Sequence, residues 1–373
     1  MSRRPETREK EKKQIKYFDY TLLFIIIFLV GFGLVMLYST SSYNAQVKFS
    51  NSAFYLRKQL LASLLGFGGM FFVAHVDYHI WTRLSGLAYI TALGLCTLVI
   101  FAGAEYNGSS RWLRVGGLSF QPSELAKFAV IIFLATIISR IPKQIGSFKT
   151  LIKIGFVVLP IFLVVGQNNL STAIIIAGIA FCMLFVASPK YIHFFFVAIV
   201  LAIGGTAFIL LESYRGNRLR IWLHPEDYEK GYQTLQGLYA IGSGGLFGKG
   251  LGESMQKLGF LPEAQNDMIF SIICEELGLF GAICVILLFL LLIWRFLVIA
   301  NNEPDLFGAL IVVGIMAHIA IQVILNIAVV TNTIPNTGIT LPFISYGGTS
   351  VAILLTEMGL ALSVSRRIKL EMV

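Results

Sequence analysis

The 373-residue sequence predicts an all-α integral membrane protein with ten transmembrane helices. Only 13% of its residues are charged, 56% are hydrophobic, and the mean hydropathy is +0.78. A soluble domain carries about a quarter charged residues. The apolar residues also occur in uncharged runs long enough to cross a bilayer. Together, these observations exclude an ordinary soluble enzyme.

The ten predicted spans follow from helix geometry. At about 1.5 Å per residue, a hydrocarbon core of about 30 Å needs about 20 helical residues. Runs that meet or approach this length cover residues 20–39, 59–76, 81–102, 122–139, 151–166, 171–187, 191–211, 268–298, 306–330 and 349–365. The eighth run is long enough to tilt or to extend beyond the bilayer. The first is longer than the apolar core of a signal peptide, so we expect it to be retained.

The distribution of Lys and Arg predicts the orientation of these spans. An even number of spans places both termini on one side, and the segments on that side hold 17 of the 29 Lys and Arg residues. The opposite loops hold 11. Because basic loops remain in the cytoplasm, both termini are expected there. This topology also accounts for the net charge of +9, so we expect no nucleic-acid partner.

The sequence predicts one membrane domain, residues 17–366, between a basic cytoplasmic tail, 1–16, and a second cytoplasmic tail, 367–373. The largest outward loop, 212–267, separates the seventh and eighth spans and is long enough to form a lid or a site. The outward loop 331–348 is uncharged and rich in Gly and Pro. Its backbone polar groups cannot face lipid, so we expect it to be re-entrant or to pack against the outer site.

Two common types of site are not predicted. All four cysteines lie inside apolar runs without a CxxC pair, which indicates neither a zinc site nor a disulfide framework. The segment 242–250, GSGGLFGKG, resembles a phosphate-binding loop, but Gly250 stands where Ser or Thr is required. We therefore expect no nucleotide.

A charged pair stands at the predicted start of the fourth span. Pro122 suits the first position of a helix, and Glu124 follows where a carboxylate meets the positive end of the helix dipole. Lys127 lies three residues later on the same face. One interpretation is a capped helix end with a local ion pair. The other is a functional site, because charges at the mouth of an apolar bundle are costly unless they meet substrate or solvent.

Asp267 is the last charged residue before the apolar run that starts the eighth span. It could be a helix-start residue that accepts bonds from the first turn. Alternatively, it could be a general base or metal ligand whose pKa is raised at the apolar boundary. Glu275 and Glu276 lie about two turns further into the same helix, where we expect interhelical hydrogen bonds or a buried pair with a cation.

A cluster of basic residues follows the seventh span. Arg215, Arg218 and Arg220, with Lys230 nearby, could bind an anionic head group such as a diphosphate at the outer leaflet. A solvated loop face explains the same charges equally well.

Taken together, these motifs resemble the SEDS family (shape, elongation, division and sporulation) of membrane peptidoglycan polymerases. The resemblance is carried, in family order, by Arg111-Trp112, Gln121-Pro122-Ser123-Glu124 with Lys127, Gly244-Gly245-Leu246-Phe247-Gly248, Leu261-Pro262-Glu263-Ala264 with Asp267, Glu275-Glu276-Leu277-Gly278, and the segment 337–350. The residues around 232–242 and 254–257 are more similar to the division and sporulation branch, FtsW and SpoVE, than to the rod-elongation branch, RodA.

The resemblance implies a SEDS-type bundle of ten spans and polymerisation of lipid II into glycan strands at the outer face of the cytoplasmic membrane, for septal synthesis in cell division. It implies catalytic roles for Asp267, Glu124 and Lys127, with Asp267 either as the general base or as the ligand of a Mg²⁺ or Mn²⁺ ion that helps to ionise the acceptor hydroxyl. Substrate contacts are then expected from Arg111, Gln121, Ser123, Arg218, Arg220, Lys257, Glu263, Ser345, Gly347 and Gly348. The implied partners are the growing glycan strand, a class B penicillin-binding protein, other divisome proteins and membrane lipids.

The sequence departs from the family pattern at two places. Asn169 stands where the family usually carries an outward Asp, which argues against a catalytic or metal role for that position here. Gln265-Asn266-Asp267-Met268 replaces the common His-Thr-Asp-Phe, although the carboxylate itself is kept.

Two other functions compete with the polymerase. A lipid II flippase would need polar residues along the whole path across the membrane, whereas the charged motifs here cluster on the outward side and only Glu275, Glu276, His318 and Glu357 lie deep. A division scaffold without activity would tolerate loss of Asp267.

Overall fold

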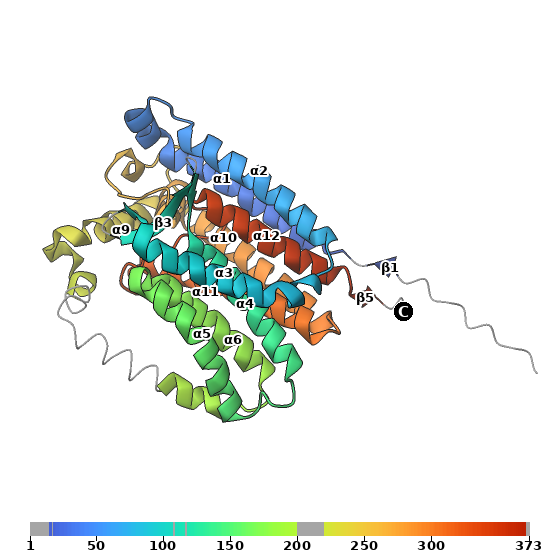
Figure 1. The fold of residues 1–373 in the computed structure, drawn as a ribbon. Helices are drawn as coiled ribbons and strands as arrows, with labels where there is room; N and C mark the ends of the chain where they lie inside the picture. The colour runs from blue at the N-terminus through green and yellow to red at the C-terminus, as the bar shows by residue number, and fades with distance from the viewer. Residues whose placement is uncertain (1–14, 17, 107–108, 116–117, 200–219, 371–373) are drawn as a thin grey trace, which may run out of the picture.

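The computed structural model describes residues 15–16, 18–106, 109–115, 118–199 and 220–370. Within these ranges the chain forms a bundle of long helices (Figure 1). Eight of them are long and apolar enough to cross a membrane: α1 (Tyr20–Phe49), α3 (Ile80–Ala102), α4 (Pro122–Arg140), α5 (Phe148–Asn168), α6 (Leu170–Ala187), α10 (Ile269–Asn302), α11 (Leu306–Val330) and α12 (Gly348–Ser365). The chain is therefore a multi-pass membrane protein.

Two further predicted spans stand apart from these eight. The second lies within α2 (Phe54–His75), which packs against α12 more extensively than any other two elements of the described chain do against each other. The approach is so close that a Cβ at Gly359 would clash with the Met70 carbonyl oxygen. Small residues allow such contacts between membrane helices. The seventh predicted span, 191–211, is described only as far as residue 199, and is helical over 192–199.

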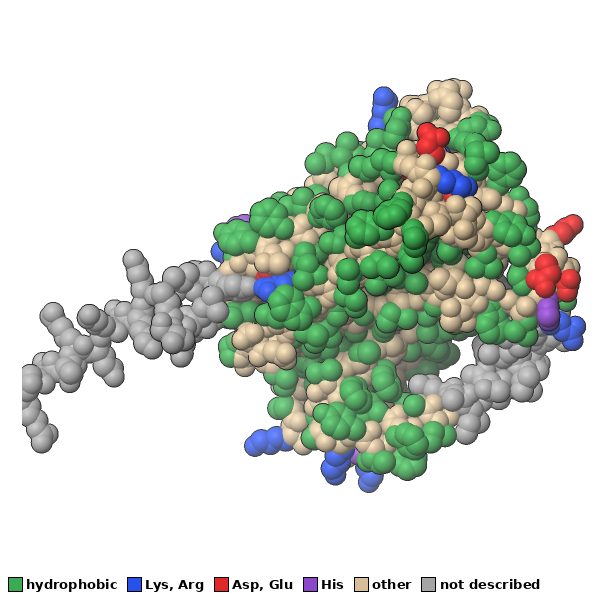
Figure 2. Space-filling view, turned by 180° about the vertical axis from the view of Figure 1, so that it is seen from behind, with side chains coloured by type: hydrophobic (Ala, Val, Ile, Leu, Met, Phe, Trp, Pro, Cys, Tyr) green, Lys and Arg blue, Asp and Glu red, His purple; other side chains and the backbone are tan. Residues whose placement is uncertain are grey.

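The core of the bundle is formed by α4, α11 and α12. In the most apolar window of α4, 72% of the residues are buried, compared with 28% in α3 and in α5. The outer helices instead expose large apolar side chains, as expected for a lipid-facing surface. Figure 2 shows hydrophobic side chains across the middle of one face, with charged side chains mainly toward its margins.

The two ends of the bundle carry different small elements (Figure 1). At one end are a short antiparallel sheet, α9 (Tyr232–Gly244) and three short helical turns. Two of these turns precede α9 and one follows it. The sheet strands are β2 (Ala104–Tyr106), β3 (Ser109–Val115) and β4 (Leu118–Phe120), and the turns are η1 (Pro225–Asp227), η2 (Glu229–Gly231) and η3 (Gln256–Leu258). At the other end, β1 (Ile15–Lys16) pairs antiparallel with β5 (Lys369–Leu370), so the segments near both termini lie together.

The eighth predicted span is not one continuous helix. α10 breaks at Gly278, whose φ of 67° and ψ of −168° are not helical. The preceding loop fills the break: the backbone N–H of Lys249 donates to the Glu275 carbonyl at 3.0 Å, and that of Leu279 donates to the Gly245 carbonyl at 2.9 Å. The short first part of α10 and the loop 245–250 are thereby joined into one unit.

The loop 331–348 packs into the bundle as expected. It contains neither helix nor strand up to Gly347, yet Leu341, Phe343 and Ile344 are buried. It approaches the middle of α1, where a Cβ at Gly33 would lie 2.5 Å from the Phe343 carbonyl oxygen. A hydrogen bond of 2.9 Å from the Tyr346 N–H to the Gln265 carbonyl joins it to the segment before α10.

Candidate active site

Asp267 lies in the turn that precedes α10, at the end of the bundle that carries α9. The helix-start interpretation is wrong, because the N-cap is Met268 and no side chain caps the helix. The Asp267 side chain is only 7% exposed, and no described residue donates a side-chain hydrogen bond to its carboxylate. Burial raises the pKa of Asp267 to about 7, and the negative charge of Glu263 adds to this shift.

The backbone around Asp267 is fixed by α11. Asn326 donates from its side-chain amide to the Asp267 carbonyl at 2.8 Å and to the Ile339 carbonyl at 2.7 Å. Gly338 lies directly opposite the carboxylate, since a Cβ there would be 3.9 Å from Asp267 Oδ2. The loop 331–348 therefore forms one wall beside Asp267.

Glu124 and Lys127 form a buried ion pair in the first turns of α4. Lys127 Nζ lies 2.9 Å from Glu124 Oε1, with side-chain exposures of 1% and 8%. Ser350 of α12 donates to Glu124 Oε2 at 2.8 Å, and Lys127 Nζ donates to Gln322 Oε1 at 3.1 Å. As the sequence predicts, Pro122 occupies the first turn of the helix. The pair is thus part of a network that joins α4, α11 and α12.

Three polar residues in α11 build this network: His318, Gln322 and Asn326. They are spaced four residues apart in an otherwise apolar helix, so they share one face. All three are buried, and they link Glu357, Lys127, the loop 331–348 and Asp267. Gln322 and Asn326 were not identified from the sequence, although polar residues repeated every four positions in an apolar helix indicate a polar face.

Glu275 and Glu276 are both buried and each pairs with a lysine, as expected; Lys257 is buried, whereas Lys249 is 34% exposed. Lys249 Nζ lies 2.6 Å from Glu275 Oε1, and Lys257 Nζ lies 2.7 Å from Glu276 Oε1. Ser39 of α1 also donates to Glu276 Oε1, at 2.7 Å. The two glutamates thus bind the loop 245–258 to α10 and α1.

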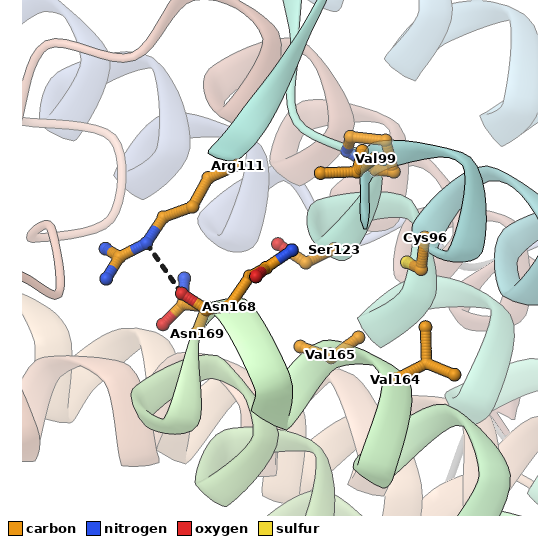
Figure 3. Close-up of a pocket in the computed structure, with 9 residues that line it drawn as sticks. Cys96, Val99, Arg111, Ser123, Val164, Val165, Asn168 and Asn169 are labelled. Atoms are coloured by element: carbon orange, nitrogen blue, oxygen red, sulfur yellow. Dashed lines mark hydrogen bonds between the residues drawn. The ribbon is translucent and has the colours of Figure 1, made fainter. Parts of the chain in front are cut away.

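Arg111 and Ser123 line a small pocket with a polar rim and apolar walls (Figure 3). It lies among α3, β3, α4 and α5, and its other lining residues are Cys96, Val99, Pro122, Val164, Val165, Asn168 and Asn169. Arg111 Nε donates to the Asn168 carbonyl at 3.0 Å. Asn169, which replaces the usual family Asp, accepts from the Thr172 N–H at 3.1 Å and so caps α6.

The predicted substrate contacts are placed in different surroundings. Gln121 is partly exposed and donates to Ser123 Oγ at 3.1 Å, while Arg220 is exposed. Arg218 lies outside the described residues. Glu263 is partly exposed at a φ of 53° and accepts a hydrogen bond from Asn266.

Four of these predicted contacts make bonds or close contacts within the fold, and their roles toward substrate stay predictions. Lys257 is 5% exposed, and its ammonium group is held by Glu276 and Ser39. Ser345 is 2% exposed and accepts from the Leu341 N–H. The Gly347 N–H donates to Gln59 of α2, and Gly348 packs beside Ala62. The polar side chains of Lys257 and Ser345 are thus bonded within the fold, and the two glycines carry no side chain.

Among the described residues, His224, Glu226 and Asp227 form a cluster whose ligand atoms all lie within 4.8 Å of one another. The cluster lies at η1, and all three residues are exposed. Exposed groups of this kind are common without a metal, and Asp267 is not among them.

With this geometry described, a family can be assigned. A family model described as cell cycle protein, which groups FtsW, RodA and SpoVE, matches residues 20–370. The chain belongs to this FtsW/RodA/SpoVE family.

Several proteins of the FtsW/RodA/SpoVE family are similar along nearly the whole chain. Stage V sporulation protein E of Bacillus subtilis (strain 168) is 42% identical over 354 residues, which cover 93% of this chain and 97% of that protein. The probable peptidoglycan glycosyltransferase FtsW of Geobacter sp. (strain M18) is 36% identical over 363 residues, covering 96% and 99%.

Solved structures agree with this assignment. A chain from a structure on the coordination of polymerization and crosslinking by a peptidoglycan synthase complex matches with a TM-score of 0.77 and 26% identity, covering 94% of this chain and 98% of that one. The rod shape determining protein RodA of Thermus thermophilus matches with a TM-score of 0.69 and 26% identity, covering 94% and 97%. The bundle is therefore a RodA/FtsW-like fold.

Proposed function

We propose that this protein is a peptidoglycan glycosyltransferase that polymerises lipid II into glycan strands on the outer face of the bacterial cytoplasmic membrane, for septal wall synthesis in cell division. The observation that carries the proposal is Asp267, a buried carboxyl with a pKa of about 7 at the end of the bundle opposite the termini. Relatives named as probable peptidoglycan glycosyltransferases, which match 96% and 95% of this chain, support it.

The reaction joins a sugar hydroxyl to an anomeric carbon. The 4-hydroxyl of the acceptor sugar attacks the anomeric carbon of the lipid-linked donor strand and forms the new C–O bond. The bond from that carbon to the diphosphate breaks, and configuration is inverted. Asp267 accepts the hydroxyl proton, for which a pKa near the working pH is suited.

The departing polyprenyl diphosphate needs compensating positive charge. The candidates among the described residues are Arg111, at the rim of the pocket beside α4, the exposed Arg220, and Lys127; Arg218, outside the described residues, stays a candidate. Lys127 is already paired with Glu124, so it contributes a fixed dipole rather than a full charge. The polyprenyl tail is expected to lie between the helices, where apolar surface is available.

A divalent cation fits the donor atoms near Asp267. Asp267 and Glu263 offer carboxylate oxygens, and the buried amide oxygen of Gln265 has no hydrogen-bond partner among the described residues. Oxygen donors suit Mg²⁺ and Mn²⁺. Bound there, such an ion would help to ionise the acceptor hydroxyl and neutralise the leaving group.

The same proposal includes ten spans with both termini in the cytoplasm. α2 and the helix that begins at residue 192 would complete the set, with the large outward loop between spans seven and eight. The pairing of β1 with β5 supports termini on one side, and the excess of Lys and Arg supports the cytoplasm. The active site would then face outward.

A class B penicillin-binding protein is the proposed partner, because a related chain occurs in a structure on coordinated polymerization and crosslinking. Other divisome proteins would bring the pair to the septum. The flippase alternative is retained for one reason: His318 and Glu357 form a fully buried polar pair between α11 and α12.

The test is a gel assay of the purified protein, with its transpeptidase partner, on fluorescent lipid II in the presence of Mg²⁺ or Mn²⁺. Glycan ladders from the wild type that are lost in Asp267→Ala, at unchanged folding and partner binding, would support the polymerase. Movement of labelled lipid II across proteoliposome leaflets without ladders would favour the flippase. Unchanged ladders from Asp267→Ala would overturn the role of this carboxylate.

A further inference from the structure

The two halves of the proposed site are far apart in the sequence. Glu124 and Lys127 lie at the start of α4, whereas Asp267 precedes α10. The polar face of α11, defined by His318, Gln322 and Asn326, contacts both halves. The hydrogen bonds of His318, Gln322 and Asn326 show how this face connects the two halves.

Gln322 has only one amide orientation that satisfies its contacts. Its Nε2 lies 3.0 Å from the Thr340 carbonyl oxygen, which can only accept, so the NH₂ group must face Thr340. Its Oε1 then faces Lys127 Nζ at 3.1 Å and His318 Nε2 at 3.0 Å. The amide thus connects the ammonium group to the loop that lines Asp267.

This orientation fixes one hydrogen atom on His318. Because Gln322 Oε1 is an acceptor, His318 Nε2 must carry a hydrogen and donate it. The other ring nitrogen, Nδ1, lies 2.8 Å from Glu357 Oε2. One proton is shared there, either on the ring or on the carboxyl group, and in both arrangements Nε2 remains the donor.

Asn326, one turn further along α11, holds the half of the site that contains Asp267. Its NH₂ group donates both hydrogens, one to the Asp267 carbonyl and one to the Ile339 carbonyl. It therefore holds the Asp267 backbone against the loop that Gln322 holds at Thr340. Both amides are nearly inaccessible, at 2% exposure for Gln322 and 0% for Asn326, so water does not compete for these bonds.

We infer that His318, Gln322 and Asn326 are positioning residues that set the Lys127 ammonium group and the Asp267 carboxylate at the separation needed for glycosyl transfer. None of them reaches the substrate. Glu357 contributes indirectly, because its hydrogen bond fixes the orientation of the His318 ring. This inference rests on the proposed function.

A positioning role predicts a loss in turnover rather than in binding. Gln322→Met and Asn326→Leu remove the amides with little change in side-chain size. Displacement of reacting groups by about 1 Å can cost about 100-fold in rate, so we expect kcat for glycan synthesis to fall by about 10- to 100-fold, with KM for lipid II changed by less than about threefold.

The matched control is Ser363→Ala. Ser363 is also buried, and its hydroxyl donates across helices to a backbone carbonyl, that of Val76, but at the end of the bundle near the termini. We expect kcat and KM to be unchanged in this variant. If the α11 variants lose only thermal stability and keep the kcat of Ser363→Ala, the residues are merely structural and the inference is overturned.

A second measurement reads the hydrogen-bond direction in the wild type itself. In protein labelled with ¹⁵N-histidine, with the His318 signal assigned by its loss in His318→Gln, we expect a protonated Nε2 in the wild type. A bare Nε2 would overturn the inferred bond direction. If the wild type itself made no glycan, the proposed function would fail instead, which is a different outcome from active wild type with indifferent α11 variants.

Discussion

Lys257 Nζ lies 2.7 Å from Glu276 Oε1, inside the fold, although the two residues belong to a loop and to a helix. The side chains are 7% and 0% exposed, so each buried charge is compensated by the other rather than by water. A buried ion pair is strongly destabilised when one partner is removed, by about 3–5 kcal/mol. The pair therefore joins the loop before α10 to that helix.

We expect Lys257→Met to lower the thermal stability of the purified protein markedly. The control, Lys249→Met, removes a lysine that is 34% exposed and should cost less. Restoring neutrality with Lys257→Met/Glu276→Gln should recover part of the loss. A Lys257→Met protein with wild-type stability and a higher KM for lipid II would instead support the substrate contact expected from the sequence.

Gly248 has a φ of 79°, and a Cβ there would clash with the Glu276 carbonyl oxygen. We expect Gly248→Ala to push the loop out of the break in α10 and to lower both stability and activity, by several kcal/mol in stability. Gly242→Ala is the control, because no atom lies within 4 Å of the position that its methyl group would occupy, and its φ is not positive. Equal melting temperatures for the two variants would contradict this account.

Asp267→Asn should abolish glycan synthesis and at the same time stabilise the protein. The pKa of Asp267 is raised from about 3.9 in an unfolded chain to about 7. Between these pH values the unfolded state releases the proton and the folded state keeps it, so stability falls as the pH rises. At neutral pH the asparagine removes a penalty of up to about 4 kcal/mol. Melting curves at acidic and neutral pH test this, since the gain should vanish in acid.

The rate of glycan synthesis should rise with pH through about 7, because the proposed base must lose its proton. Glu263→Gln removes a negative charge that raises the pKa of Asp267. We therefore expect the rising limb of the pH–rate profile to move to lower pH in this variant. Initial rates on fluorescent lipid II across the profile provide the measurement, and a shift to higher pH would exclude Asp267 as the titrating group.

The helical membrane class and most spans could be predicted because a long apolar run has few alternatives in a bilayer. The break at Gly278 could not, because it depends on backbone bonds from a loop some thirty residues earlier, which no local pattern records. The short sheet around β3 was missed for a related reason: two of its strands, β2 and β4, have only three residues each, and the segment shows weak alternation.

In the candidate site, too, local features could be predicted from the sequence and contacts between distant residues could not. The ion pair of Glu124 with Lys127 follows from helical spacing and could be predicted. The pairing of Lys257 with Glu276 could not be predicted, because the sequence does not show that these two residues lie within reach of each other. The Asn326 bonds join residues separated by 59 and 13 positions, so their target could not be read from the chain.

The antiparallel pairing of Ile15–Lys16 with Lys369–Leu370 places the first and last described segments side by side. A short linker could join the two ends without crossing the membrane, and new termini could then be opened in a loop elsewhere. Such circular permutants are tolerated when the original ends are close together. A permutant opened in the loop between α4 and α5, on the side of the original ends, would carry its tags there and leave Asp267 and its surroundings unaltered.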